Sequence, residues 1–250
     1  MQKTYSMVAI EVKDMGLKFK LSRFKATRVK SVLQGFLSKT PETAQRDHFW
    51  ALRNLNFTLN SGEVLGVIGS NGSGKSTLLR TIGGIFVPDE GAIEVSGRAS
   101  ALLSLGTGFK DDLNGKENIY LNATILGFTQ EEINAVIEDI IAFSELHQFI
   151  YEPVKNYSSG MKARLGFAIA VHLKREVMLI DEILGVGDFK FRSKSTEKIK
   201  ELINDDRTVI LVSHSMESIK SYCTKCLWID KGVQKAFGET EEVVAAYLKS

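Results

Sequence analysis

Cysteine is scarce in this chain, and long apolar runs are absent. Two of the 250 residues are cysteines, Cys223 and Cys226, in a single C-x-x-C with no second pair or ligand histidine nearby. We therefore expect no metal or redox site there and interpret both as reduced, partly buried thiols. No run of about eighteen apolar residues occurs, and no apolar stretch follows a basic start. We expect neither a membrane-spanning helix nor a signal peptide, and hence synthesis in the cytosol.

An excess of one charge is lacking too. The 32 basic and 30 acidic residues leave a formal net charge of +2, which gives no electrostatic reason to expect a nucleic-acid partner. No internal repeat or low-complexity tract is visible. With 44% apolar residues a chain of this length can bury a full core, so we expect one domain over residues 1–250.

A glycine-rich segment lies between the apolar run Val64–Ile68 and a helix-like stretch. It fits the pattern G-x-x-x-x-G-K-[ST] and consists of Gly69, Ser70, Asn71, Gly72, Ser73, Gly74, Lys75 and Ser76, followed by Thr77. Glycines let successive backbone N–H groups point at one anion, and the helix start adds the positive end of its dipole. Lys75 can reach the β- and γ-phosphates, and Ser76 can ligate Mg²⁺. The segment predicts one nucleoside triphosphate site, because no second copy occurs.

Two acids follow another apolar run, Val177–Ile180. Such a run is typical of a strand buried on both faces of a parallel sheet, and ligands bind at the carboxyl ends of these strands. Asp181 is placed to hold the hydration shell of Mg²⁺, and Glu182 to polarise an attacking water. Helix N-capping is the alternative for this pair. A third apolar run, Thr208–Val212, brings Ser213 and His214 to the same edge, which is the argument for a catalytic His214.

Other elements can be predicted more coarsely. We expect an antiparallel layer beside the nucleotide, made of strands Val8–Val12, Ala51–Leu59, Ala92–Val95 and Ala99–Leu103. We expect helices over Asn114–Leu126 and Glu131–Phe143, the second opened by a capping box of Thr129 and Glu132. The end of the chain predicts a hairpin of Cys226–Asp230 and Val233–Phe237 and then a helix over Thr240–Leu248.

The segment Tyr157-Ser158-Ser159-Gly160-Met161-Lys162-Ala163-Arg164 opens a helix over Leu165–His172. It resembles the signature motif of ATP-binding cassette (ABC) ATPases, usually L-S-G-G-Q, with Ser158 and Gly160 matching and Tyr157, Ser159 and Met161 departing. A serine and a glycine at a helix start still form an anion site. The family's Asp-box resembles Gly185-Val186-Gly187-Asp188, and its switch histidine matches His214.

The resemblance covers nearly the whole chain and implies a fold. It is the α/β P-loop NTPase fold of an ABC nucleotide-binding domain, with a RecA-like core, an antiparallel β-subdomain and a helical subdomain. The implied divisions are residues 1–19 and 49–105 for the β-subdomain with the phosphate loop and 106–172 for the helical subdomain. Residues 173–250 would carry the acidic strand, the switch histidine and the C-terminal hairpin and helix.

Two family features are less clear in this chain. An aromatic residue after the first strand stacks on adenine in the family, and Phe19 occupies that place, with Phe49 and Trp50 as rivals and a plain core role as the alternative. A glutamine normally links the Mg²⁺ site to the transport partner. No glutamine occurs between Lys75 and Gln130, where Gly106-Thr107-Gly108-Phe109 lies instead, so this chain departs from the family at that coupling contact.

An insertion, residues 20–48, separates two strands that the family usually joins by a short loop. Its apolar residues Val29, Val32, Leu33, Phe36 and Leu37 recur at helical spacing and are flanked by Arg28, Lys30 and Lys39. A basic amphipathic helix suits the headgroup region of a membrane. A helix packed on its own domain is the equal alternative, and Gly35 weakens either by about 1 kcal/mol relative to Ala.

The insertion and the segments around Phe49, Gly106, Gly115 and Tyr157 resemble one ABC branch, the ATPase subunits that export lipid-linked polysaccharides such as O-antigen, capsule and teichoic acid. The resemblance implies a homodimer at the cytoplasmic face of the membrane, bound to a separate transmembrane permease dimer that carries the glycan, with ATP and Mg²⁺ as cofactors. A soluble cassette acting on nucleic acid or ribosomes is the alternative function. Such proteins are usually more basic or carry a second cassette or a long coiled coil. A third, non-hydrolysing scaffold is disfavoured by Glu182 and His214.

Overall fold

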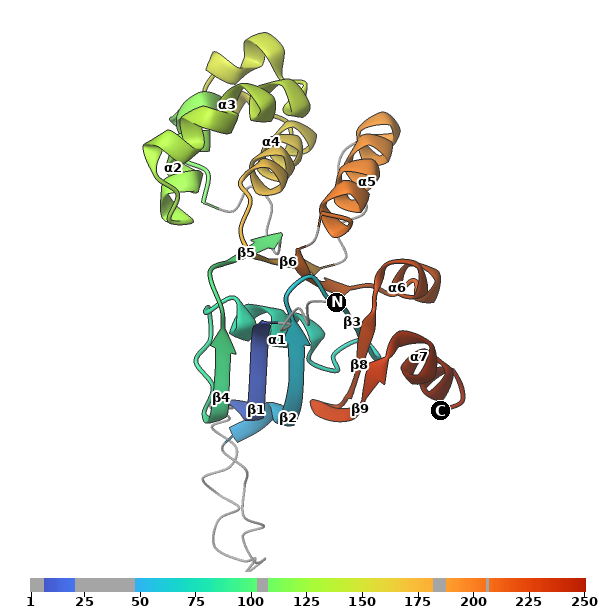
Figure 1. The fold of residues 1–250 in the computed structure, drawn as a ribbon. Helices are drawn as coiled ribbons and strands as arrows, with labels where there is room; N and C mark the ends of the chain where they lie inside the picture. The colour runs from blue at the N-terminus through green and yellow to red at the C-terminus, as the bar shows by residue number, and fades with distance from the viewer. Residues whose placement is uncertain (1–6, 21–47, 103–107, 182–187, 206) are drawn as a thin grey trace, which may run out of the picture.

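The computed structural model describes residues 7–20, 48–102, 108–181, 188–205 and 207–250. Its helices and strands follow the order shown in Figure 1. The strands are β1 Val8–Lys20, β2 His48–Asn60, β3 Val64–Ile68, β4 Glu90–Val95, β5 Ala99–Leu102, β6 Val177–Asp181, β7 Thr208–Val212, β8 Lys225–Asp230 and β9 Val233–Glu239. The helices are α1 Lys75–Ile82, α2 Gly115–Ile125, α3 Gln130–Ser144, α4 Ser159–His172, α5 Phe189–Ile203, α6 Met216–Tyr222 and α7 Thr240–Leu248, with short 3₁₀ turns at His147–Tyr151 and Val154–Asn156.

The described strands form one sheet in the order β4-β1-β2-β9-β8-β3-β7-β6-β5. The part of the sheet from β8 to β5 is parallel, because each pair of neighbours in the order β8-β3-β7-β6-β5 runs in the same direction. Along β7, Val209 and Leu211 pack in the core on one face, and Ile210 and Val212 pack in the core on the other. Both faces are therefore covered, which is why the predicted strands β3, β6 and β7 read as unbroken apolar runs. All three predictions are confirmed.

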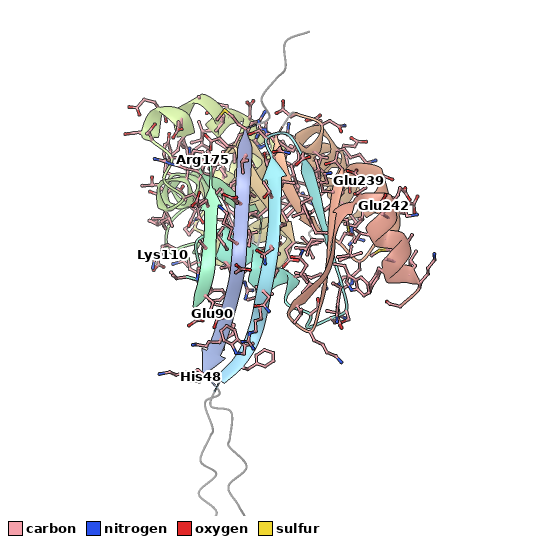
Figure 2. The ribbon with its side chains drawn as sticks, turned by 60° about the horizontal axis from the view of Figure 1, so that its bottom comes forward. His48, Glu90, Lys110, Arg175, Glu239 and Glu242 are labelled. Atoms are coloured by element: carbon pink, nitrogen blue, oxygen red, sulfur yellow. The ribbon has the colours of Figure 1, made fainter. Side chains whose placement is uncertain are left out.

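An antiparallel layer of β4, β1 and β2 lies beside this core. Strand β1 pairs with both of the others, as expected. Figure 2 shows the three strands side by side, with Glu90 and His48 near the same end. Both β1 and β2 are longer than predicted, because β1 continues past a bulge at Asp14, where φ is 46°. The pair closes with Lys20 opposite His48, so the insertion leaves from the tip of this ribbon. Residues 21–47, and with them the expected amphipathic helix, lie outside the described residues.

Strand β5 is the one strand whose predicted partner was wrong. Ala99–Leu103 was expected in the antiparallel layer, yet β5 pairs in parallel with β6, with Ala99 opposite Val177. The pairing begins where the backbone N–H of Arg98 donates to the carboxylate of Glu176 over 3.0 Å. A four-residue strand of sequence Ala-Ser-Ala-Leu carries no local signal for its neighbour, since strand pairing is set by contacts distant in sequence.

Helices α2, α3 and α4 form a separate arm above the sheet (Figure 1). Their apolar faces meet in a core of their own, which includes Ile119, Ile137 and Leu165. The predicted capping box is confirmed, because Thr129 and Glu132 exchange both hydrogen bonds at the start of α3. Helix α4 begins at Ser159, six residues earlier than expected, because Ser158 caps it.

The C-terminal hairpin and helix are confirmed. Lys231 and Gly232 have φ of 47° and 78°, the conformation that a two-residue hairpin turn needs. Strands β8 and β9 pair across this turn, and α7 packs against them. Among the residues that the structure describes, no helix is both long and apolar enough to cross a membrane.

Cys223 and Cys226 are buried free thiols, more enclosed than expected. Burial raises the pKa of each to about 12.

A thiol with that pKa is about one part in ten thousand thiolate at pH 8, and the thiolate is the reactive form. We expect no alkylation by iodoacetamide at pH 8 in the native protein and reaction of both thiols in denaturant, measured by mass spectrometry. Rapid native labelling would contradict this.

Candidate functional site

The glycine-rich segment forms a tight loop between β3 and α1. Gly69, Gly72 and Gly74 have φ of 147°, 77° and 110°, values that residues with a Cβ rarely adopt. At Gly74 a Cβ would lie 2.6 Å from the side chain of Leu52 and 2.9 Å from the carbonyl oxygen of Ala51. Glycine is therefore required there by space as well as by conformation. The loop leads directly into α1, with Gly74 as its N-terminal cap.

Lys75 is the first residue of α1, and it reaches back over the loop. Its side chain is buried, and Nζ lies 2.9 Å from the carbonyl oxygen of Gly69 and 3.0 Å from that of Ser70. The ammonium is thereby held across the loop whose backbone surrounds it. A positive charge, a helix start and glycine-rich backbone in one place suit the oxygens of a phosphate.

A pocket of about 420 Å³ opens beside this loop. Its lining combines residues from the antiparallel layer, the loop and the strand ends, namely Phe19, Phe49, Ala51, Asn71, Gly72, Gly74, Lys75, Ser76, Thr77, Asp181, Val212 and His214. Two candidate metal ligands, Ser76 and Asp181, thus share one pocket with Lys75. A hydroxyl and a carboxylate are hard oxygen donors of the kind that Mg²⁺ prefers, so the residues present fit this ion.

Asp181 and His214 come together because of the strand order. Asp181 is the last residue of β6 and lies opposite Val212, the last residue of β7. His214 follows two residues later and is exposed at the same edge, while Ser213 accepts a hydrogen bond from the backbone of Ser215 at 3.1 Å. Glu182, the proposed general base, lies outside the described residues.

Two of the three candidate aromatics line this pocket. Phe19 and Phe49 face each other across the β1–β2 pair and are 39% and 55% exposed. Phe19 also makes an edge contact with Phe86, at 5.4 Å between ring centroids. Trp50 is absent from the lining, and the cations of Lys18 and Arg53 lie 5.3 and 4.9 Å from its ring centroid. The pocket therefore favours Phe19 or Phe49 over Trp50 as a stacking surface.

We expect Phe19→Ala to weaken ATP binding by about 5-fold or more, because stacking of a base on an aromatic side chain is worth about 1–3 kcal/mol. Phe49→Ala tests the rival residue. Trp50→Ala is the matched control and should leave affinity within about twofold of wild type. A fluorescent-nucleotide titration measures all three. Equal losses for Phe19→Ala and Trp50→Ala would contradict this assignment.

The signature segment lies apart from the pocket. Ser158 caps α4 by accepting a hydrogen bond from the backbone of Met161 over 3.1 Å, and Ser158 and Ser159 are exposed. Neither these serines nor Gly160 lines the pocket. The structure thus gathers the phosphate loop, Asp181 and His214 in one place and leaves Ser158, Ser159 and Gly160 on the arm.

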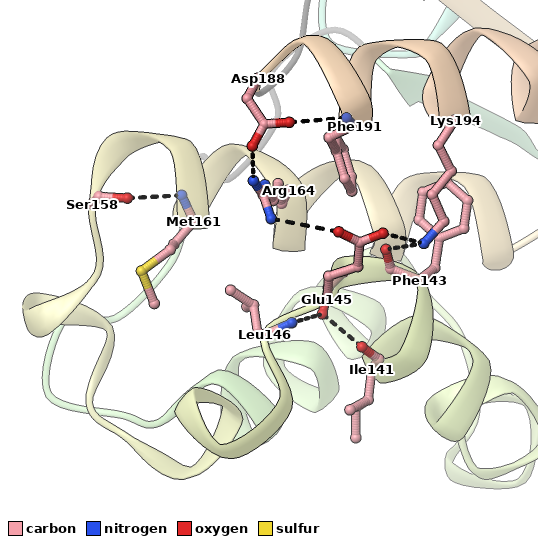
Figure 3. A network of polar contacts seen from close by, with 11 residues as sticks. Ile141, Phe143, Glu145, Leu146, Ser158, Met161, Arg164, Asp188, Phe191 and Lys194 are labelled. Atoms are coloured by element: carbon pink, nitrogen blue, oxygen red, sulfur yellow. Dashed lines mark hydrogen bonds and ion pairs between the residues drawn. The ribbon is translucent and has the colours of Figure 1, made fainter.

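A polar network that the sequence did not predict joins α4 to α5 (Figure 3). Arg164 of α4 bonds to Asp188, and Asp188 accepts a hydrogen bond from the backbone of Phe191 as the cap of α5. This backbone bond and the charge of Arg164 lower the pKa of Asp188. Glu145, at the end of α3, contacts both Arg164 and Lys194. Arg164 and Asp188 stood inside quoted motifs, whereas Glu145 and Lys194 carried no sequence signal.

A parallel sheet, a phosphate loop and a strand-end acid in one pocket define a P-loop nucleotide-binding domain. The family model described as "ABC transporter" matches residues 52–185, which is more than half of the chain. The chain belongs to the ABC transporter family, with the fold of its nucleotide-binding domain.

Relatives support this assignment over almost the whole chain. The O-antigen export system ATP-binding protein RfbB of Myxococcus xanthus is 43% identical over 247 residues, 98% of this chain and 56% of its own length. The teichoic acids export ATP-binding protein TagH of Lactococcus lactis is 44% identical over 97% of this chain and 51% of its own length. TagH of Staphylococcus saprophyticus is 40% identical over 97% and 89%. The chain thus spans about half the length of the first two.

Solved structures agree in fold. An ATP-binding subunit of an ABC transporter has a TM-score of 0.70 and 22% identity, covering 96% of this chain and 93% of its own. A dimeric ATP-binding cassette in a post-hydrolysis state, bound to ADP and Pi, has a TM-score of 0.68 and 19% identity, covering 92% and 98%. At these identities the likeness concerns the fold alone.

Proposed function

We propose that this chain is the ATP-hydrolysing subunit of a transporter that exports a lipid-linked polysaccharide or a teichoic-acid-type polymer. The observation that carries the proposal is the single pocket shared by the phosphate loop, Asp181 and His214. The names of the relatives, which concern export of O-antigen and teichoic acids, supply the class of cargo. They favour export over the alternative of a cassette acting on nucleic acid or ribosomes.

The candidate site residues have separate roles in this proposal. The backbone of Gly69 to Thr77 and the Lys75 ammonium bind the phosphates of ATP, and Phe19 stacks on adenine. Ser76 and Asp181 would hold Mg²⁺, which neutralises phosphate charge when bound. Glu182 takes the proton of the attacking water, and His214 lies at the same strand edge to contact the γ-phosphate.

The division of the chain follows from the same proposal. Residues 1–19 and 49–105 form the β-subdomain with the phosphate loop, except that β5 belongs to the central sheet. The basic insertion was expected over residues 20–48, but Lys20 and His48 pair in β1 and β2, so it is bounded by these two residues. Residues 106–172 are the helical subdomain, and 173–250 the part with Asp181, His214 and the C-terminal hairpin and helix.

A second copy of the chain would complete the site. The resemblance to the ABC family implies that the signature helix of one subunit places Ser158, Ser159 and Gly160 against the ATP bound to the other. Within one chain these three residues do not line the pocket. Ser158 and Ser159 are exposed at the start of α4, which leaves a helix N-terminus available to an anion. The proposed assembly is a homodimer on the cytoplasmic face of the membrane, bound to a transmembrane permease dimer that carries the glycan.

Co-expression with a candidate permease tests this assembly. The permease and a lipid-linked sugar should co-purify with the chain from membranes, and the complex should hydrolyse ATP in a Mg²⁺-dependent manner. Co-purification with ribosomes or nucleic acid in place of a permease would contradict the export function. Absence of ATP hydrolysis in the purified complex would contradict the enzymatic one.

A further inference from the structure

Glu145 adopts a backbone conformation that its residue type disfavours. It ends α3 in the left-handed region, with φ of 58° and ψ of 25°. Glycine or asparagine usually occupies such a helix end, because a longer side chain brings its Cβ too close to the backbone. A glutamate held in this conformation indicates that its side chain makes interactions that offset the strain.

Those interactions are two ion pairs to two different helices. Glu145 Oε1 lies 3.0 Å from Lys194 Nζ of α5, and Oε2 lies 3.8 Å from the Arg164 guanidinium of α4. The side chains of Glu145, Arg164 and Lys194 are 28, 23 and 35% exposed, so solvent screens them only in part. The hydrogen bond from Lys194 is the main cause that lowers the pKa of Glu145.

Lys194 is itself held in place from the arm. Its ammonium also donates to the carbonyl oxygen of Phe143 over 3.0 Å and lies 4.5 Å from the centroid of the Phe143 ring. Beneath it, Phe143, Phe167 and Phe191 pack together with centroids 5.7 to 6.1 Å apart. The end of α3 therefore contacts α5 through both polar and aromatic side chains.

The two helices that Glu145 contacts lead to different parts of the proposed site. Ser158 caps the start of helix α4, and Arg164 lies six residues further on. Asp188, which Arg164 also contacts, caps the start of helix α5, and Asp181 precedes it in the chain. A shift of α4 against α5 would change where Ser158 lies relative to the helix that follows β6.

We propose that Glu145 is a positioning residue for ATP hydrolysis, holding the signature helix at a set distance from the helix that follows the catalytic strand. This inference rests on the proposed function and adds to it a residue outside the nucleotide pocket. Glu145 acts through Arg164 and Lys194, and it does not line the nucleotide pocket. The left-handed backbone is the conformation that brings its carboxylate between the two cations.

Two substitutions separate positioning from plain stability. Glu145→Gln removes the charge and keeps the strain, whereas Glu145→Gly removes the charge and relieves the strain. For both we expect kcat to fall about 3- to 30-fold, the range seen when a coupling residue outside a site is changed. The ATP dissociation constant should stay within about twofold, since the pocket is built from other elements. The melting temperature of Glu145→Gly should stay within about 4 °C of wild type.

The matched control is Glu138→Gln, which changes an exposed carboxylate on the same helix and should leave kcat unchanged. A merely structural role would lower the melting temperature and leave kcat per folded molecule unaltered, and that result would overturn the proposal. So would a kcat within twofold of wild type for both Glu145 variants.

A distance measurement tests the same idea without ATP hydrolysis. Spin labels on cysteines introduced at the exposed positions Ala135 of α3 and Glu197 of α5 report the separation of the arm and α5. The distance distribution should broaden in Glu145→Gly and Glu145→Gln and remain narrow in Glu138→Gln. Unchanged distributions in both Glu145 variants would overturn the positioning role. A wild-type protein with a narrow distribution and no ATPase activity would instead contradict the proposed function alone.

Discussion

Replacing Glu182 with glutamine is expected to lower kcat for ATP hydrolysis by about 10²–10⁴-fold, the usual contribution of a general base. An amide cannot accept the proton of the attacking water, while it is close to a carboxylate in size. ATP should still bind, because Glu182 is not needed to hold the phosphates. Phosphate release measures turnover, and a separate nucleotide titration measures affinity. Activity within tenfold of wild type would reject the role.

Asp181→Asn gives the matched comparison, since Asp181 is the neighbouring acid and lines the pocket. It should weaken Mg²⁺-dependent nucleotide binding as well as turnover, because in the proposed site the lost charge would face the ion.

The Glu182→Gln protein should also dimerise when ATP is added, because in the proposed dimer hydrolysis would no longer separate the subunits. Light scattering measures this. A wild-type protein that remains monomeric and keeps its full ATPase activity at high dilution would contradict a site shared between two copies.

The sequence predicted elements that depend on local or strictly periodic signals. Strands β3, β6 and β7 could be predicted because both faces of the sheet are covered there, so their sequences are almost entirely apolar. The start of α3 could be predicted because Thr129 and Glu132 are three residues apart. The side chain of each accepts a hydrogen bond from the backbone N–H of the other. The loop at Gly69 to Ser76 could be predicted because phosphate binding needs glycine, lysine and a hydroxyl residue at fixed spacing along the chain.

Features that depend on distant partners could not be predicted. Strand β5 has no local mark of its pairing with β6, and the bulge at Asp14 hid the continuation of β1 as far as Lys20. The bridge from Glu145 to Arg164 and Lys194 joins three helices, and its left-handed residue is not a glycine that would have signalled a helix end. The choice between Phe19, Phe49 and Trp50 also depended on which face of a twisted strand pair borders the pocket.

Gly69→Ala is expected to have the largest effect on the folded phosphate loop. Gly69 has φ of 147°, and a Cβ there would lie 2.0 Å from the backbone carbonyl oxygen of Ile229 in β8 and 2.8 Å from Ser73 Oγ. The carbonyl belongs to a strand paired with β3, so it cannot move aside without disturbing the central sheet. Strain and clash together should cost about 3 kcal/mol or more.

Gly72→Ala is the matched control on the same loop. Its φ of 77° is also left-handed, but a Cβ there would meet nothing within 4 Å, so only conformational strain of about 1–2 kcal/mol applies. Since 1 kcal/mol shifts the melting temperature of a domain this size by about 2–4 °C, Gly69→Ala should melt about 6–12 °C below wild type and lose ATP binding. Gly72→Ala should melt about 2–8 °C below wild type and at least about 2–4 °C above Gly69→Ala, because its cost is smaller by about 1 kcal/mol or more. Calorimetry and a nucleotide titration measure both proteins, and a Gly69→Ala protein that melts and binds ATP like Gly72→Ala would show that the loop does not need its close approach to β8.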